Sequence, residues 1–173
     1  MIAEQGGRCA ICEEKPAEHV DHDHATGEVR GVLCFTCNVG LGQLRDDLAV
    51  IHNAALYLLR TLEPLPTDRL RGLPGDGLRL LSTGRGAAGL GHVWRRYGLA
   101  ERELAEMLAV QRGVCVICLT GPPEHVDHDH RTGEVRGILC SGCNSGLGSF
   151  GDDLDRLYGA LRYLLARDEL FVA

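Results

Sequence analysis

Residues 18–38 read E-H-V-D-H-D-H-A-T-G-E-V-R-G-V-L-C-F-T-C-N, and residues 124–144 read E-H-V-D-H-D-H-R-T-G-E-V-R-G-I-L-C-S-G-C-N. The offset between the two stretches is 106 positions (124 − 18). No insertion or deletion interrupts it, so residues 1–67 align directly with residues 107–173, and 36 of these 67 positions are identical. The chain is therefore a tandem repeat, and any chemistry of one copy is expected to occur twice.

The eight cysteines form four C-x-x-C pairs, two in each copy. In the first copy 21 residues, from Glu13 to Leu33, separate the two pairs. Four thiolates at this spacing can surround a zinc ion tetrahedrally and leave no position open for water, which makes such a site structural. Disulfide bonds and a redox-active C-x-x-C are the alternatives, and a reducing cytoplasm favours zinc over both. We therefore expect two structural Zn²⁺ sites, formed by Cys9, Cys12, Cys34 and Cys37 and by Cys115, Cys118, Cys140 and Cys143.

The net charge of −6 over 173 residues is unusual for a general DNA-binding protein, which is ordinarily basic. Many of the acidic residues lie inside the repeated motif, however, where bound cations would offset them. The first twelve residues are polar and contain no apolar signal-peptide core, and no stretch reaches the length of a membrane span. A cytoplasmic protein without a membrane partner is expected.

Each copy is predicted to fold as a β-hairpin followed by helices. Residues 18–24 and 29–34 have the composition of short strands, and Gly27 in the intervening turn can adopt a positive φ. A short helix is expected after Cys37, and a longer helix over residues 47–61 has its twin over residues 153–167. The expected buried side of the longer helix consists of Leu48, Ile51, Ala55, Leu58, Leu59 and Leu62.

Composition divides the chain into three predicted segments. The first repeat module covers residues 1–63, a Gly/Pro-rich linker covers 64–91, and a lead-in helix with the second module covers 92–173. The apolar spacing of the lead-in helix runs into residues 107–111, which align with residues 1–5. We therefore expect either that the first copy has lost its lead-in helix or that the true start of the protein lies upstream.

The motifs H-V-D-H-D-H and T-G-E-V-R-G-x-L-C-x-x-C-N, with their flanking cysteine pairs, resemble the recombination endonuclease VII family. That family belongs to the HNH, or ββα-metal, nucleases, and the resemblance extends over nearly all of each copy. It implies an α+β fold of two tandem zinc-stapled ββα-metal modules joined by the linker and a helix. It also implies that each module binds one catalytic Mg²⁺ or Mn²⁺ and cleaves DNA phosphodiesters.

The resemblance also assigns roles to residues of the motif. Asp21 and the side-chain oxygen of Asn38 would bind the divalent cation, which prefers oxygen ligands. His22 would take the proton from the attacking water, and His24 would contact phosphate or relay protons. Arg30 would hold a neighbouring phosphate. The second copy offers the corresponding set of Asp127, Asn144, His128, His130 and Arg136.

Two features of the motif leave geometric alternatives. Adjacent residues of a regular strand point to opposite faces, so a site that uses both Asp21 and His22 needs a bend or bulge between them. A regular strand would instead pair Asp21 with Asp23. Some family members carry an acidic residue where this chain has Leu41, so either two protein ligands suffice or Asp46 or its neighbour Asp47 reaches the site.

Two functions are consistent with these patterns. The first is a metal-dependent DNA endonuclease with two active sites, which nicks DNA or resolves branched DNA, either as a monomeric pseudo-dimer or as a homodimer. The second is a non-catalytic zinc-knuckle module that binds nucleic acid or protein. A further zinc site or plain surface polarity is the alternative role for the histidines, and helix capping is the alternative role for Asn38.

Overall fold

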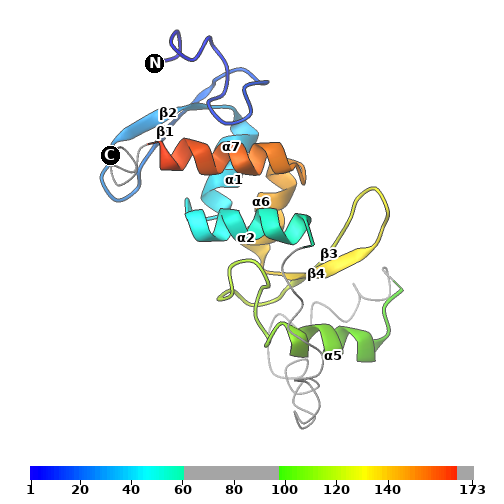
Figure 1. The fold of residues 1–173 in the computed structure, drawn as a ribbon. Helices are drawn as coiled ribbons and strands as arrows, with labels where there is room; N and C mark the ends of the chain where they lie inside the picture. Colours follow the sequence, from blue (N-terminus) through cyan, green and yellow to red (C-terminus); the bar gives the residue numbers. More distant parts are fainter. Residues whose placement is uncertain (61–97, 167–173) are drawn as a thin grey trace. The chain divides into compact units, whose positions relative to one another are not determined.

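The computed structural model describes residues 1–60 and 98–166 and shows the expected α+β architecture in two similar halves (Figure 1). The predicted linker over 64–91 and the beginning of the lead-in helix, from His92, lie outside the described residues. Each half contains a two-stranded antiparallel sheet followed by two helices. None of the described helices has the length and hydropathy needed to cross a lipid bilayer.

The two hairpins have the same register. In the first, β1 (His19–His22) pairs with β2 (Val29–Leu33), and in the second, β3 (His125–His128) pairs with β4 (Val135–Leu139). Their tight turns contain Gly27 at φ 76° and Gly133 at φ 75°, as expected for a conformation that glycine adopts without strain.

Two of the repeat helices begin after a capping aspartate, and α1 begins at a cysteine pair. α1 (Phe35–Gln43) starts at the second cysteine pair, with Cys34 as the residue that precedes it. α2 (Leu48–Leu58) and α7 (Leu154–Leu165) both start after an aspartate whose carboxylate accepts hydrogen bonds from two backbone N–H groups of the first turn. Asp47 and Asp153 are these capping residues. The fourth helix of the repeats is α6 (Ser141–Phe150).

The buried side of α2 differs from the expected one. Ile51 and Ala55 are buried as predicted, and Leu48 and Leu58 are partly buried. Leu59 follows the end of the helix and is 43% exposed, and Leu62 lies outside the described residues. The residues that actually complete the buried side are Val50, Ala54 and Tyr57. The apolar content of the helix, which is high on all sides, left its orientation ambiguous from sequence.

The described residues cluster into two compact units. The first unit comprises residues 1–59 and 145–166, and the second comprises residue 60 and residues 98–144. The division falls inside α6, so the last two helices of the second repeat are largely in the unit that contains the first repeat. The predicted boundaries at 63/64 and 91/92 concern the repeats along the chain and remain a prediction.

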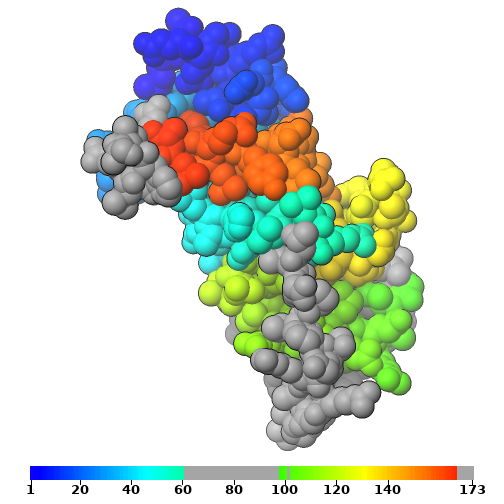
Figure 2. Space-filling model, viewed as in Figure 1, coloured from blue at the N-terminus to red at the C-terminus, as the bar shows by residue number. Residues whose placement is uncertain are grey.

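In the first unit α7 packs against α2, and Figure 2 shows α7 in orange between the blue N-terminal segment and the cyan surface of α1 and α2. A glycine makes this packing close. A Cβ at Gly159 would lie 2.5 Å from the carbonyl oxygen of Ile11, which lies between Cys9 and Cys12. Helix α7 therefore approaches this backbone at a distance that only glycine permits.

The second unit contains the described part of the lead-in helix, α5 (Glu101–Val110). The backbone N–H of Ala100 donates to the Glu103 carboxylate at 2.6 Å, which closes the start of the helix. Helix α5 packs on β4. The core of this unit consists of Leu104, Leu108, Val126 and Ile138. In the first unit, the aligned residues 1–7 form turns and no helix.

Candidate active site and zinc sites

The two cysteine groups have the geometry of tetrahedral zinc sites. In each group the four sulfur atoms lie within 4.8 Å of one another, and all eight cysteines are free thiols. The Sγ atoms of Cys12 and Cys34 are 3.9 Å apart, and those of Cys118 and Cys140 are 3.8 Å apart. Zn–S bonds of about 2.3 Å at tetrahedral angles place sulfurs roughly 3.8 Å apart, whereas a disulfide requires about 2.05 Å. The groups could therefore each hold a zinc ion.

The thiols of each group interact strongly. The Cys37 thiol donates a hydrogen bond that lowers the pKa of Cys9 to about 4, against the opposing effect of burial. The same interaction with Cys143 lowers the pKa of Cys115 to about 5. The pKa values of Cys37 and Cys143 are correspondingly raised above the usual thiol value. Closely packed thiols cannot all ionise without a cation, and a bound zinc ion would supply that charge.

Asp21 is the buried polar centre of the first unit, with a relative exposure of 6%. Its carboxylate forms a two-point ion pair with Arg30, in which Nε donates to Oδ2 at 2.7 Å and Nη2 donates to Oδ1 at 3.0 Å. The hydroxyl of Tyr163, on α7, donates to the same Oδ2 at 2.8 Å. Burial lowers the pKa of Arg30, but hydrogen bonds from its guanidinium to Asp21 and Asp46 outweigh burial and raise it.

A bulge lies where the motif required one. The register pairs Asp21 with Gly31 and His22 with Val29, so Arg30 is the extra residue of β2. The second hairpin has the same shift between Asp127 and His128. A bulge redirects side chains locally, and here it carries the Arg30 side chain to Asp21. Asp21 is buried, whereas His22 is exposed.

The motif histidines at the end of each hairpin lie close together in pairs. The rings of His22 and His24 have centroids 5.0 Å apart, and those of His128 and His130 are 4.8 Å apart. Nδ1 of His24 is 3.0 Å from Oδ2 of Asp46, and this carboxylate oxygen also accepts from Nη2 of Arg30 at 2.8 Å. Asp21, Arg30, Asp46 and His24 therefore form one continuous polar network.

Two other aspartates have local structural roles. Asp23 accepts hydrogen bonds from the backbone N–H groups of Ala25 and Thr26, both at 2.8 Å, and these bonds lower its pKa. It shapes the hairpin turn and so does not support the two-carboxylate alternative with Asp21. Asp47 caps α2, whereas Asp46 accepts a hydrogen bond from Arg30. Of the two aspartates considered as substitutes for an acidic residue at Leu41, Asp46 is therefore the one that joins the network.

Asn38 lies in the first turn of α1 and is partly buried. The residue at the cap position is Cys34, so helix capping is not the role of Asn38. Leu41, one turn further along, is fully buried at 0% exposure. Within residues 1–60 and 98–166, only the two cysteine groups bring three or more His, Cys, Asp or Glu ligand atoms close together, so a further zinc site of histidines gains no support there.

The second repeat reproduces the central ion pair. Nε of Arg136 donates to Oδ2 of Asp127 at 2.7 Å, and Nη2 donates to Oδ1 at 3.0 Å. Asp127 is 5% exposed, close to the value for Asp21. The expected phosphate-binding arginines, Arg30 and Arg136, are thus both paired with the aspartates expected to bind the cation.

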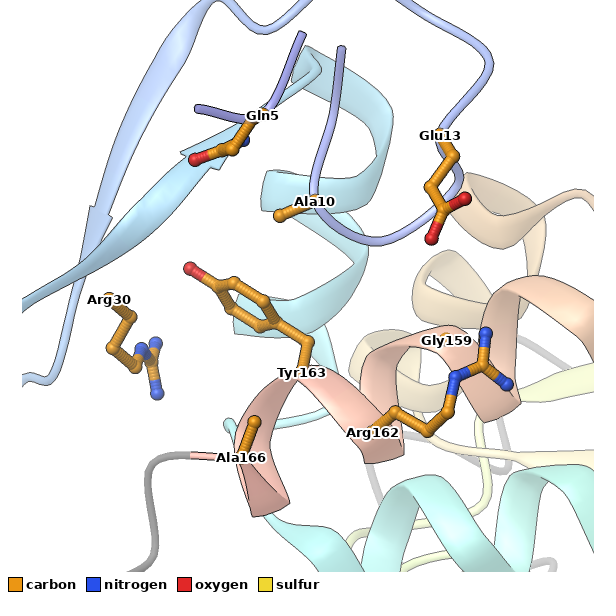
Figure 3. Close-up of a pocket in the computed structure, with 8 residues that line it drawn as sticks. All are labelled: Gln5, Ala10, Glu13, Arg30, Gly159, Arg162, Tyr163 and Ala166. Carbon is orange, nitrogen blue, oxygen red and sulfur yellow. The ribbon is translucent and has the colours of Figure 1, made fainter. Parts of the chain in front are cut away.

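A cavity of ≈ 280 Å³ lies beside the network in the first unit. Figure 3 shows Tyr163 in the middle of its lining, with Arg30 and Arg162 on either side of it. These two arginines come from different repeats. The lining is completed by Gln5, Ala10, Glu13, Gly159 and Ala166.

Tyr163 is the residue of this network that sequence reasoning missed. It lies 142 positions from Asp21, on α7, a helix that the sequence pattern predicts without assigning any of its residues to the site. The available signal was weak: Tyr57 occupies the aligned position of the first repeat (163 − 106 = 57), so the tyrosine is one of the identical positions outside the motif.

The fold and the sites define an α+β protein with two repeated hairpin–helix modules, each with a tetracysteine group that could hold zinc. The model of the recombination endonuclease VII family matches residues 1–60 and 91–166, and the chain belongs to this family.

Two phage proteins are similar to parts of the chain. The Gene 59 protein of Mycobacterium phage D29 is 40% identical over 81 residues, which cover 39% of this chain and 49% of that protein. The Gene 59 protein of Mycobacterium phage L5 is 50% identical over 60 residues, which cover 32% of this chain and 37% of that protein. The chain thus spans half or less of these relatives. No solved structure matches it.

Proposed function

We propose that the protein is a metal-dependent DNA endonuclease of the HNH type, with one active site in each repeat. Membership in the recombination endonuclease VII family supports DNA as the substrate. The observation that carries the proposal is the bulge between Asp21 and His22, repeated between Asp127 and His128, because it supplies the local distortion that a site using both neighbours needs. Branched DNA is the proposed substrate class within this reaction.

The residues present fit a hard divalent cation such as Mg²⁺ or Mn²⁺. A carboxylate oxygen offers about two lone pairs, and Oδ1 of Asp21 accepts one hydrogen bond from the described residues. Asp21 and Asn38 would hold the cation in the first repeat, and Asp127 and Asn144 in the second. A bound divalent cation would neutralise charge on the scissile phosphate and on the leaving oxygen.

The residues around the cation-binding pair would carry out the proton transfers. A ring nitrogen of His22 would accept the proton of the attacking water, and its exposed position leaves it open to a DNA strand. The contact with Asp46 orients the ring of His24 and favours a proton on Nδ1, so that Nε2 would relay a proton or, when it is itself protonated, donate to a phosphate. Arg30 would hold Asp21 in place and compensate its charge. His128, His130 and Arg136 would have these roles in the second repeat.

Two sites on one chain suit cleavage of two strands. The resemblance is to a family that includes enzymes acting as dimers, and the tandem repeat would provide two sites without a second subunit. We therefore propose a monomeric pseudo-dimer. Light scattering behind gel filtration tests this state, and a tight homodimer would contradict it.

Nicking of supercoiled plasmid in Mg²⁺ tests the proposed reaction. The double variant His22→Ala with His128→Ala is expected to lose nicking while it retains zinc and its circular dichroism spectrum. His52→Ala is the matched control, because His52 is exposed on α2 and outside the motif. If the double variant nicks as fast as the control, His22 and His128 are not the bases. If wild-type protein binds labelled branched DNA but never cleaves it, the non-catalytic binding module is the correct function.

A further inference from the structure

We propose that α7 of the second repeat forms part of the first repeat's active site, where the Tyr163 hydroxyl positions the Asp21 carboxylate for cation binding. The inference rests on the proposed function, because it assigns a positioning residue to that same site. Tyr163 would touch neither the cation nor the DNA in this role and would act through Asp21.

The hydrogen bond between the two side chains is short and protected from water. The Tyr163 hydroxyl donates to Oδ2 of Asp21 at 2.8 Å, and the two residues are 8% and 6% exposed. A hydrogen bond to an ionised acceptor is stronger than one between neutral groups, and burial strengthens it further. The bond therefore restrains the position and orientation of the Asp21 carboxylate.

The same bond decides which carboxylate oxygen can receive a cation. Oδ2 accepts from Arg30 Nε at 2.7 Å as well as from Tyr163, so both of its lone pairs are used. Oδ1 accepts one bond from the described residues, from Arg30 Nη2 at 3.0 Å, and one lone pair remains. Tyr163 thus directs the cation to Oδ1. Without its hydroxyl, either oxygen could bind, and the carboxylate would lose one of its three anchors.

Contacts of α7 elsewhere hold the tyrosine in register. Gly159 allows the helix to approach the Ile11 carbonyl, and Arg156 Nη2 donates to the Glu14 carboxylate at 2.8 Å. At the hairpin, a Cβ on Gly31 would lie 3.0 Å from the Tyr163 hydroxyl oxygen. The absence of a side chain at Gly31 therefore leaves the space that the tyrosine occupies.

The test compares Tyr163→Phe with Tyr158→Phe in the full, zinc-loaded chain. Tyr158 lies on the same helix and is 37% exposed, so it controls for loss of a hydroxyl from α7. Mn²⁺ titration followed by electron paramagnetic resonance measures cation affinity directly. Tyr163→Phe is expected to weaken one class of Mn²⁺ sites about tenfold to a hundredfold, as for other residues that orient metal ligands. Tyr158→Phe is expected to match wild type.

A second variant, on the hairpin instead of on α7, perturbs the same hydrogen bond between Tyr163 and Asp21. Gly31→Ala keeps the hydroxyl but pushes it from the carboxylate, so it should weaken Mn²⁺ binding in the same direction. Nicking by both variants should be slow at low Mn²⁺ and recover at high Mn²⁺, which a merely structural defect would not do.

The outcomes separate this inference from the proposed function. If the Mn²⁺ affinity of Tyr163→Phe equals that of Tyr158→Phe, or if wild type binds no Mn²⁺, the positioning role is wrong. If wild type binds Mn²⁺ but does not cut DNA, the proposed function fails, and the difference in affinity between the two variants still decides the role of Tyr163.

Discussion

Replacing Arg30 by alanine should destabilise the protein far more than replacing an arginine in an equally short ion pair on the surface. Arg30 and Asp21 are 2.7 Å apart, with side chains 8% and 7% exposed. Arg102 and Glu106 are 2.8 Å apart, with side chains 89% and 58% exposed. The closest contact distances are alike, so the two pairs differ in their burial and in the additional hydrogen bonds that Arg30 donates to Asp21 and Asp46. Removing one partner of a buried pair strands the other charge, which costs about 3–5 kcal/mol.

The expected loss converts to a measurable shift. For a chain of this size each kcal/mol lowers the melting temperature by about 2–4 °C, so Arg30→Ala should lower it by roughly 6–20 °C. Thermal unfolding with excess zinc, followed by circular dichroism, measures the shift. Arg102→Ala should change the melting temperature little, since an exposed pair exchanges its partner for water.

The cost of leaving the Asp21 carboxylate without Arg30 can also be measured separately. Asp21→Asn with Arg30→Ala removes both charges, so the double variant should be more stable than the sum of the two single losses implies. Strict additivity, or an Arg102→Ala shift as large as that of Arg30→Ala, would refute the reasoning. The Arg136–Asp127 pair provides an independent repetition of the experiment.

Three further predictions concern zinc, packing and pH. The purified chain should contain two zinc ions by mass spectrometry, and chelation should unfold it, because four-thiolate sites contribute about 10 kcal/mol or more to folding; a chelated chain with an unchanged spectrum would contradict this. Gly159→Ala should lower the melting temperature because its Cβ would meet the Ile11 carbonyl at 2.5 Å, whereas Gly148→Ala, in α6 with open space around it, should raise it slightly; equal shifts would show that the close approach is unimportant. The pKa values of Asp23 and Asp129 are depressed below their ordinary 3.8, so the hairpin turns should be stabilised above that pH and loosen as pH falls through the lower folded-state value. Amide chemical shifts of the turn residues, followed during acid titration, would disprove this if they moved at or above pH 3.8.

The local parts of the fold could be predicted because local residues determine them. The cysteine spacing, the glycine of the hairpin turn and the aspartate that caps α2 each act over a few positions, and the predicted hairpins and the helices that follow them are present. The orientation of α2 was predicted less well because leucine, valine and alanine occupy most of its sides. The pairing of Arg30 with Asp21 depends on a bulge, which the sequence required without indicating which residue would be extra.

The contribution of α7 could not be predicted because it is a tertiary event. A helix of the second repeat packs equally well, by pattern alone, on its own hairpin or on that of the first repeat. The glycine at position 159, where the first repeat has Asn53, is the sequence feature that permits α7 to pack closely on the first repeat. A single glycine in a helix has several ordinary explanations, however, so it does not predict this packing. The sequence alone therefore does not predict that the first unit contains helices of both repeats.

The docking of α7 sets the order in which this protein can mature on the ribosome. Tyr163 is translated 142 residues after Asp21, which at about 5–20 residues per second is a delay of roughly 7–28 s. During that interval the cysteines of the first repeat can already bind zinc, but the Asp21 carboxylate still lacks the hydrogen bond from Tyr163. The first module to be synthesised is thus among the last to be finished, and a ribosome that stalls before α7 leaves it incomplete.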